Sequence, residues 1–276
     1  VMPVDRERSV MHIANLHCPC LTFQRRRQLD IPFARVSPMT ENEPDTIRYH
    51  YEFRMRGIRK EFELHLDRET LALRQEPRAA YPEWTALSCD QCPNCPLKEK
   101  EHPQCPIAAN IVDLVDEFSD ILSHDEVEMQ ITTQERSYTK TTVTSVALSS
   151  LLGIYMVTSG CPVMDKLRPL TRFHLPAGTL EETRFRTIAM YLTAQYFVHR
   201  RGGTPDWDLE MLPEIYREVG EVNRSFTQRL RGAVAADANL NALVHLDSIA
   251  STITLELDVD HLDELETLFA PYLQDV

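Results

Sequence analysis

The spacing of apolar residues changes once along this chain, near residue 143, and this change constrains the fold more than any other feature. Before it, apolar and polar residues alternate: Ile47, Tyr49 and Tyr51 fall on one face of the stretch 47–56, with Arg48 and the other charged residues on the opposite face. This period of two is typical of a half-buried strand. The same pattern predicts strands at 60–67 and 70–75, forming a β-meander, and a hairpin at 126–143.

Helical spacing dominates after residue 143. The run 143–160 is apolar almost all round and rich in small residues, so we expect a buried helix that ends at Gly160. Thr179 and Glu182 form a capping-box signature for a helix that ends at Gly202. Helical patterns also occur at 107–122, 206–234, 238–254 and 259–268.

The sequence therefore predicts an α+β protein, with an antiparallel β-meander or sheet in the N-terminal half and a helical C-terminal layer. We expect an irregular N-terminal arm at 1–45, which contains Cys18 and Cys20 in the stretch "HCPC". The sheet region would span 46–145 and include a cysteine-rich segment at 89–105, and the helical layer or subdomain would span 146–276.

Composition narrows the classes of function. The 276 residues include 43% hydrophobic and 26% charged residues, as in ordinary globular proteins with a real core. A formal net charge of −13 argues against broad binding to a phosphate backbone, so no nucleic acid is expected. No apolar run reaches the length of a membrane helix, and the N-terminus shows no signal-peptide pattern. We therefore expect a soluble, cytoplasmic protein.

Four of the seven cysteines lie between residues 88 and 110. Cys89, Cys92 and Cys95 form C-x2-C-x2-C, and Cys92, Cys95, His102 and Cys105 form C-x2-C-x6-H-x2-C. Thiolates spaced in this way are typical ligands of zinc or of an iron–sulfur cluster. A third four-ligand set is possible if the fold brings Cys161 beside the segment. The fourth ligand is therefore Cys161, His102 or Cys89.

Three interpretations of the cysteines remain open from spacing alone. Structural Zn²⁺ is the first, because four thiolate or imidazole ligands close its coordination shell. A [4Fe-4S] cluster is the second. Five cysteines precede proline, as a cysteine does in one ferredoxin ligand run, although the spacing matches neither ferredoxin pattern; they are Cys18, Cys92, Cys95, Cys105 and Cys161. Free or redox-active thiols are the third.

The runs "WTALSCDQCPNCPLKEKEHPQCPIA", "ALSSLLGIYMVTSGCP" and "RFHLP" are similar to those of an uncharacterised bacterial domain family. The resemblance covers most of residues 47–250 and implies no activity. It implies that Cys92, Cys95, Cys105 and Cys161 occupy motif positions, which favours Cys161 as the fourth ligand, with His102 next.

Other candidate residues have more ordinary explanations. His174 in "RFHLP" is either a residue of a cleft between the two halves or a satisfied, partly buried histidine, and the second is favoured. His50 and His65 fall on the polar faces of predicted strands, and Asp237 is expected to cap a helix. No P-loop, dinucleotide fingerprint, nucleophile elbow or zinc-protease motif occurs, so no catalytic residue is predicted.

We expect a metal-stabilised binding or regulatory protein, with zinc as the first choice of metal and a protein partner or a second copy of the chain as its partner. An iron–sulfur redox or sensor protein is the alternative. A metal-dependent enzyme with an open coordination position, using His174 or a carboxylate as base, is the second alternative.

Overall fold

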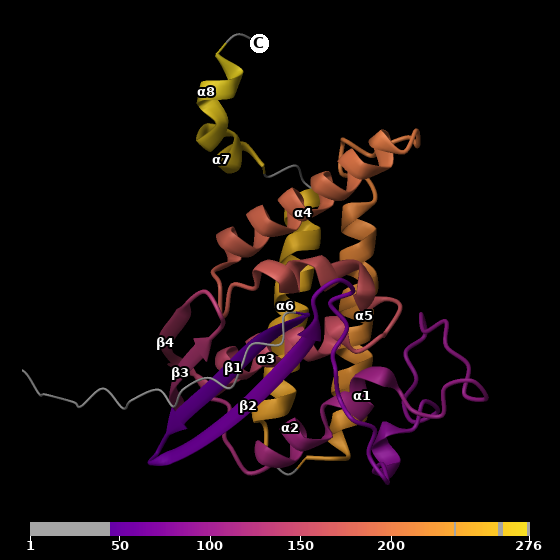
Figure 1. Ribbon diagram of the computed structural model, residues 1–276, viewed down its shortest axis with the longest axis vertical. Coiled ribbons are helices and arrows are strands. Elements are labelled where there is room, and N and C mark those ends of the chain that lie inside the picture. The colour runs from indigo at the N-terminus through magenta and orange to yellow at the C-terminus, as the bar shows by residue number, and fades with distance from the viewer. Residues whose placement is uncertain (1–44, 235, 259–261, 275–276) are drawn as a thin grey trace, which may run out of the picture. The chain divides into compact units, whose positions relative to one another are not determined.

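The computed structural model describes residues 45–234, 236–258 and 262–274. The predicted arm, with Cys18 and Cys20, lies outside these residues except for Asp45 at its end. In chain order the elements are β1 (Thr46–Met55), β2 (Ile58–Asp67), η1 (Glu83–Thr85), α1 (Pro106–Asn110), α2 (Val112–Glu117), β3 (Glu126–Thr132), β4 (Ser137–Val143), α3 (Thr144–Thr158), η2 (Met164–Phe173), α4 (Leu180–Arg200), α5 (Leu212–Arg231), α6 (Ala238–Asp258), α7 (Asp263–Glu266), η3 (Thr267–Phe269) and α8 (Ala270–Leu273). Figure 1 shows strands in the first half and helices in the second, the predicted α+β class.

The four strands form one antiparallel sheet in the order β2-β1-β3-β4. Arg56 (φ 47°) and Gly57 (φ 76°) both have positive φ, which is the requirement of the tight turn that joins β1 to β2. Tyr51 is paired with Phe62 on one side and with Ile131 on the other, so β1 is a central strand. The buried residues Ile47, Tyr49, Tyr51, Phe53 and Met55 confirm the predicted core face of β1.

The third strand expected at 70–75 is wrong. Leu73 forms an isolated bridge to Leu66, flanked by backbone hydrogen bonds from the Asp67 N–H to Ala72 and from the Arg74 N–H to His65. This contact follows a turn in which the Asp67 carboxylate accepts hydrogen bonds from the backbone N–H groups of Glu69 and Thr70. The Leu73 N–H then donates to the carbonyl oxygen of Thr158 at the end of α3, 3.1 Å away. The chain therefore leaves the sheet edge, and the centre of the sheet is the long-range pair β1–β3.

The helix expected at 107–122 is divided into α1 and α2. Ile111 interrupts it with a ψ of 11°, and its N–H bonds to the carbonyl oxygen of Ala108, three residues back. Ile111 and Val112, at the break, are both buried.

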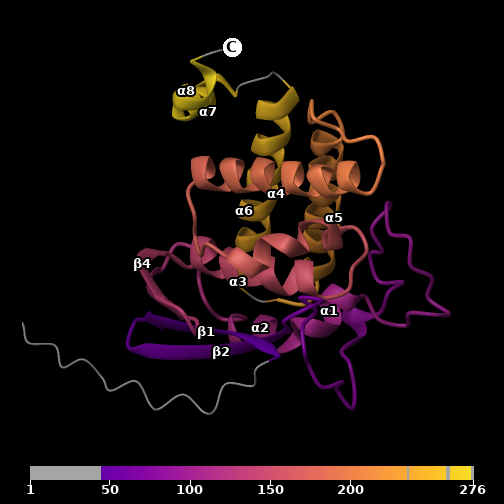
Figure 2. The same ribbon diagram turned by 45° about the horizontal axis from the view of Figure 1, so that its top comes forward.

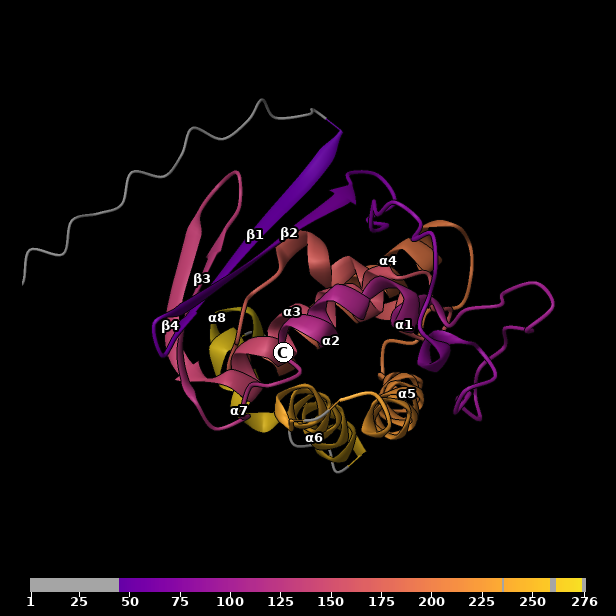
Figure 3. The same ribbon diagram turned by 90° about the horizontal axis from the view of Figure 1, so that it is seen from below.

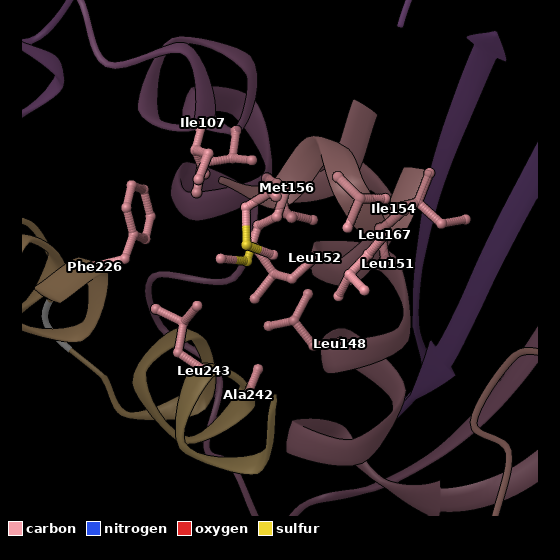
Figure 4. Close-up of a cluster of buried hydrophobic side chains, with 14 of the residues drawn as sticks. Ile107, Leu148, Leu151, Leu152, Ile154, Met156, Leu167, Phe226, Ala242 and Leu243 are labelled. Carbon is pink, nitrogen blue, oxygen red and sulfur yellow. The ribbon is translucent and has the colours of Figure 1, made fainter. Parts of the chain in front are cut away.

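α3 is the central helix of the described part of the chain. The sheet lies on one side of it and α5 and α6 lie on the other (Figure 3), and α4 crosses near α5 and α6 (Figure 2). Figure 4 shows Leu148, Leu152 and Met156 of α3 facing Phe226 of α5 and Leu243 of α6. The absence of a polar face on α3 follows from this burial on both sides. Among the described helices, none has the length and apolar content needed to cross a membrane.

The helix boundaries agree with the local signals in part. The capping box at α4 is confirmed: the Thr179 hydroxyl accepts from the Glu182 N–H at 3.2 Å, and the Glu182 carboxylate accepts from the Thr179 N–H at 2.7 Å. α5 begins at Leu212 rather than at residue 206. Before it, the Asp206 carboxylate accepts from the N–H groups of Glu210 and Met211, which holds this loop out of a helix.

Candidate metal centre

Cys92 and Cys95 lie in one tight turn of the cysteine segment. The Cys95 N–H donates to the Cys92 carbonyl oxygen at 3.0 Å, which closes the turn. Pro93 and Pro96, which follow the two cysteines, are exposed, whereas Cys92 and Cys95 are partly buried and pack against the core. The turn therefore directs both thiols inward from a short, rigid backbone.

Cys105 is the residue immediately before α1. Its N–H donates to the Thr85 carbonyl oxygen at 2.8 Å, and Pro106 occupies the first turn of the helix, where no N–H is needed. Burial raises the pKa of the Cys105 thiol, while hydrogen bonds from the backbone N–H groups of Ala108 and Ile107 oppose that rise. Backbone donors of this kind stabilise a thiolate.

Cys161 repeats this arrangement after the end of α3. α3 stops at Thr158, and Gly160 takes a φ of 90°, a conformation that disfavours any side chain. Burial raises the pKa of Cys161, and the N–H groups of Met164 and Val163 donate to its sulfur and oppose the rise. Two separate Cys-Pro sequences thus present a buried sulfur with two backbone donors.

The four cysteines that precede proline in the described chain lie in one region. Burial, followed by the nearby thiols of Cys105, Cys161 and Cys95, raises the pKa of Cys92 to about 11. Cys105 and Cys95 also raise the pKa of Cys161. Because charge interactions weaken with distance, these mutual effects require the sulfurs to be neighbours.

The sulfurs nevertheless do not form a tight group of three or more. Within the described ranges, the His, Cys, Asp and Glu side chains whose ligand atoms all lie within 4.8 Å of one another are His50, Glu52 and Glu61. No three of the described cysteine sulfurs therefore all lie within 4.8 Å of one another.

Cys89 and His102 are placed differently from the other candidates. The Cys89 thiol is 3.9 Å from the carboxylate of its neighbour Asp90. His102 is exposed, in a turn where its N–H donates to the Lys98 carbonyl oxygen. The mutual pKa effects thus link Cys92, Cys95, Cys105 and Cys161, and neither the half-buried Cys89 nor the exposed His102 takes part in them.

Arg229 of α5 is a buried cation that fixes the cysteine segment, and the sequence reasoning missed it. Its side chain is 2% exposed, and its guanidinium donates to the carbonyl oxygens of Trp84 (2.9 Å), Ala86 (2.6 Å), Leu87 (3.4 Å) and Asp90 (3.4 Å). Its Nε is buried without a hydrogen-bond acceptor. No carboxylate in the described chain pairs with Arg229, although its charge opposes the rise in the pKa of Cys105.

Two further contacts connect α5 to the same segment. The Asn94 amide, between Cys92 and Cys95, donates to the Glu218 carbonyl oxygen at 3.0 Å, and Ser225 forms a hydrogen bond with the Cys92 thiol. Ser225 lies four residues before Arg229, on the same face of the helix. The spacing of Arg229 from Phe226 and Leu230 was the available signal, because it puts a charged residue on an apolar helix face.

His50, Glu52 and Glu61 lie together on the polar side of the β1–β2 hairpin. Both carboxylates are already paired with guanidinium groups: Glu52 with Arg54 and Arg59 (3.0 Å to the latter), and Glu61 with Arg59. Little net negative charge remains there to attract a cation. This group is a weaker candidate than the four cysteines, despite its shorter distances.

His174 is hydrogen-bonded, in agreement with the favoured interpretation. Its Nε2 lies 2.6 Å from the Tyr51 hydroxyl and 3.2 Å from the Ser150 hydroxyl. Burial lowers the pKa of His174 to about 3, so the ring is neutral at pH 7. Asp237 accepts hydrogen bonds from the N–H and hydroxyl of Ser123, at 2.8 and 2.9 Å, in the chain just before α6.

Comparison with known protein families gives a match over residues 47–270, to a model described as a domain of unknown function, DUF6901. Comparison with curated proteins gives no match, and comparison with solved structures gives none. The matched span contains all four neighbouring cysteines, Arg229 and every strand of the sheet. The chain therefore belongs to the DUF6901 family.

Proposed function

We propose that Cys92, Cys95, Cys105 and Cys161 bind a metal centre, and that an iron–sulfur cluster is the occupant that fits best. The observation that carries this proposal is that three cysteines of the 89–105 segment and Cys161 affect one another's pKa. They do so beside the buried Arg229 guanidinium, which has no carboxylate partner among the described residues. A buried positive charge favours a negatively charged neighbour. A cluster held by four thiolates supplies that negative charge.

The spacing of the sulfurs favours a cluster over a single ion. Four sulfurs at 2.3 Å from one tetrahedral zinc ion would lie about 3.8 Å from one another. No three of the described cysteine sulfurs lie within 4.8 Å of each other. A cluster places iron and sulfide between the thiolates and so needs a wider opening.

The surroundings of the sulfurs suit a redox or sensor centre. Backbone N–H groups reach Cys105 and Cys161, the Ser225 hydroxyl reaches Cys92, and the charge of Arg229 lies nearby. Hydrogen bonds to sulfur and low solvent exposure are the properties that set the reduction potential of such clusters. Cys92 and Cys95, the less buried pair, would form the side nearest to solvent.

Structural zinc is the second candidate, and a different observation favours it. The four cysteines connect the 89–105 segment to the turn between α3 and η2, so a closed four-thiolate zinc site would join parts that are distant in sequence. Either occupant leaves no coordination position for a substrate water, which argues against the metal-dependent enzyme. Reduced thiols in either case suit the cytoplasm.

Anaerobic purification without added metal, followed by an absorption spectrum, tests the proposal. A cluster predicts brown protein whose thiolate-to-iron absorption is bleached by dithionite. Colourless protein with about one zinc per chain would support the second candidate and contradict the first. Protein that holds neither metal when freshly purified would contradict both.

A further inference from the structure

A second site lies away from the cysteines, where the end of η2 meets the β3–β4 turn and β1. It is a hollow of about 160 Å³. Drug-sized ligands occupy pockets of about 300 Å³ or more, so this one has room for a single small group. The residues that give it its chemistry are Tyr49, Glu135, Arg136, Tyr138, Arg172 and His174.

The two arginines of this hollow have no carboxylate partner. Within the part of the chain that the structure describes, no ion pair involves Arg136 or Arg172, whereas Arg48, Arg54 and Arg59 on β1 and β2 are all paired. The Arg172 guanidinium lies over the Phe173 ring, 5.7 Å from its centroid. Two guanidinium groups without an ion pair and one carboxylate, that of Glu135, line this small hollow, so its charged groups carry a net positive charge.

The backbone on both sides of the hollow is fixed by hydrogen bonds. The Thr133 N–H donates to the Arg136 carbonyl oxygen at 2.9 Å, which closes the β3–β4 turn. Opposite, the Tyr49 hydroxyl donates to the Thr171 carbonyl oxygen at 2.5 Å, and Arg186 donates to that of Phe173 at 2.9 Å. Arg136 and Arg172 therefore extend from rigid positions, as a preformed site requires.

His174 adds a polar atom without adding a charge. Its Nε2 is occupied by the hydroxyls of Tyr51 and Ser150. No described group forms a hydrogen bond with the His174 Nδ1. This atom is also not one of the described side-chain atoms that are buried without a hydrogen-bond partner. Nδ1 thus remains available to a ligand, on a ring that burial keeps neutral. Ser150 contacts His174 but is buried and does not line the hollow, so we assign it no catalytic role.

We propose that this hollow binds the carboxylate or phosphate group of a small anionic ligand, with Arg136 and Arg172 as the charged contacts. The planar fork of arginine matches both groups and gives short, charge-assisted hydrogen bonds. Phe173 is 79% exposed at the rim and would cover a small apolar part of the ligand. Glu135 lines the same hollow and opposes the anion. None of the cysteines lines the hollow, so this proposal does not depend on the proposed metal centre.

Isothermal titration calorimetry of the full chain with inorganic phosphate, acetate and benzoate tests this proposal. We expect saturable binding of at least one probe in the millimolar range or tighter. Phosphate as the tightest probe would indicate a phosphate ligand, and benzoate an aromatic carboxylate. Arg172→Gln and Arg136→Gln should each weaken binding about tenfold or more, because each removes a charge-assisted contact.

Two variants separate recognition from a general effect of charge. Glu135→Gln should tighten binding, a result that a purely structural role would not give. Arg200→Gln removes an exposed arginine at the far end of the 21-residue α4 and should leave binding unchanged. No binding of any probe to folded wild-type protein would overturn the proposal. Equal losses in Arg200→Gln and Arg172→Gln would overturn it too, and unchanged melting of each variant checks that it folds.

Discussion

The Arg229 guanidinium of α5 lies 2.6 Å from the carbonyl oxygen of Ala86, and through this contact a helix near the end of the chain holds the loop that leads into the cysteine segment. Trp84, Leu87 and Asp90 offer carbonyl oxygens to the same side chain. A charged group this deeply buried is stable only where polar atoms surround it. The segment and the helix are therefore parts of one packed unit, with the cysteines at their junction.

Replacing Arg229 by Met should destabilise the fold. Four carbonyl oxygens would lose the Arg229 donor, and only that of Ala86 would keep another, the Cys89 N–H, among the described residues. We expect a loss of about 3 kcal/mol in the free energy of unfolding, measured by urea denaturation. Arg231→Met is the matched control, because Arg231 is exposed and bonds only to Gln228 in the described chain. Equal effects of the two substitutions would contradict the assigned role of Arg229.

Replacing Cys161 by Ser should release the metal. Cys161 is the proposed ligand farthest in sequence from the other three, so its loss tests whether the proposed centre depends on the fold rather than on the segment alone. Cys89→Ser and His102→Ala are the controls and should keep full metal content by mass spectrometry. Metal loss in the controls, with retention in Cys161→Ser, would assign the fourth ligand to the segment itself.

Replacing Thr179 by Ala should weaken the start of α4. The hydroxyl that accepts from the Glu182 N–H is lost, and we expect a cost of about 1 kcal/mol in thermal or urea unfolding. Thr179→Ser retains the hydroxyl and should remain within a few tenths of a kcal/mol of wild type. An alanine variant as stable as the serine variant would show that the cap contributes nothing.

The stability of the protein should fall on acidification in a way that depends on His174. Its pKa is lowered to about 3 in the folded state and is about 6.5 in an unfolded chain, so between these values the unfolded chain binds the additional proton. The contribution of His174 to the free energy of unfolding is therefore complete above about pH 6.5 and decreases as the pH falls towards 3. For this group alone, we expect a loss of about 2 kcal/mol between pH 7 and pH 5.

The comparison variant is His174→Gln, whose side-chain amide can still accept a hydrogen bond from Tyr51. Unfolding curves at several pH values should show a shallower dependence for this variant, and the difference from wild type removes the contribution of the carboxylates. Parallel pH dependences would mean that His174 titrates normally in the fold.

Local patterns in the sequence predicted the structural features that depend only on residues close together in the chain. The alternation from Ile47 to Met55 identified the buried face of β1, because side chains of a strand alternate whatever the strand pairs with. Thr179 and Glu182 located the start of α4, because a capping box is completed within four residues. The expected strand at 70–75 failed because the Asp67 turn and the contact of Leu73 with α3 take the chain off the sheet.

The centre itself depends on long-range packing that spacing cannot reveal. The segment offered Cys89, Cys92, Cys95, His102 and Cys105 as near neighbours in sequence. Cys161 was also a predicted ligand, but it approaches the segment only because α3 passes through the core before Gly160 turns the chain back. The sequence did not predict the burial of Arg229, for a similar reason. A charged residue in a helix usually faces solvent, and the acceptors that permit its burial are on a distant loop.

The iron and acid-labile sulfide content of anaerobically purified wild-type protein, measured beside the Cys161→Ser variant, tests the central claim most directly. We predict about four iron and four sulfide per wild-type chain, and a large loss of both in the variant. A wild-type chain without iron and sulfide, or a variant with the same content as wild type, would contradict a cluster held by Cys92, Cys95, Cys105 and Cys161.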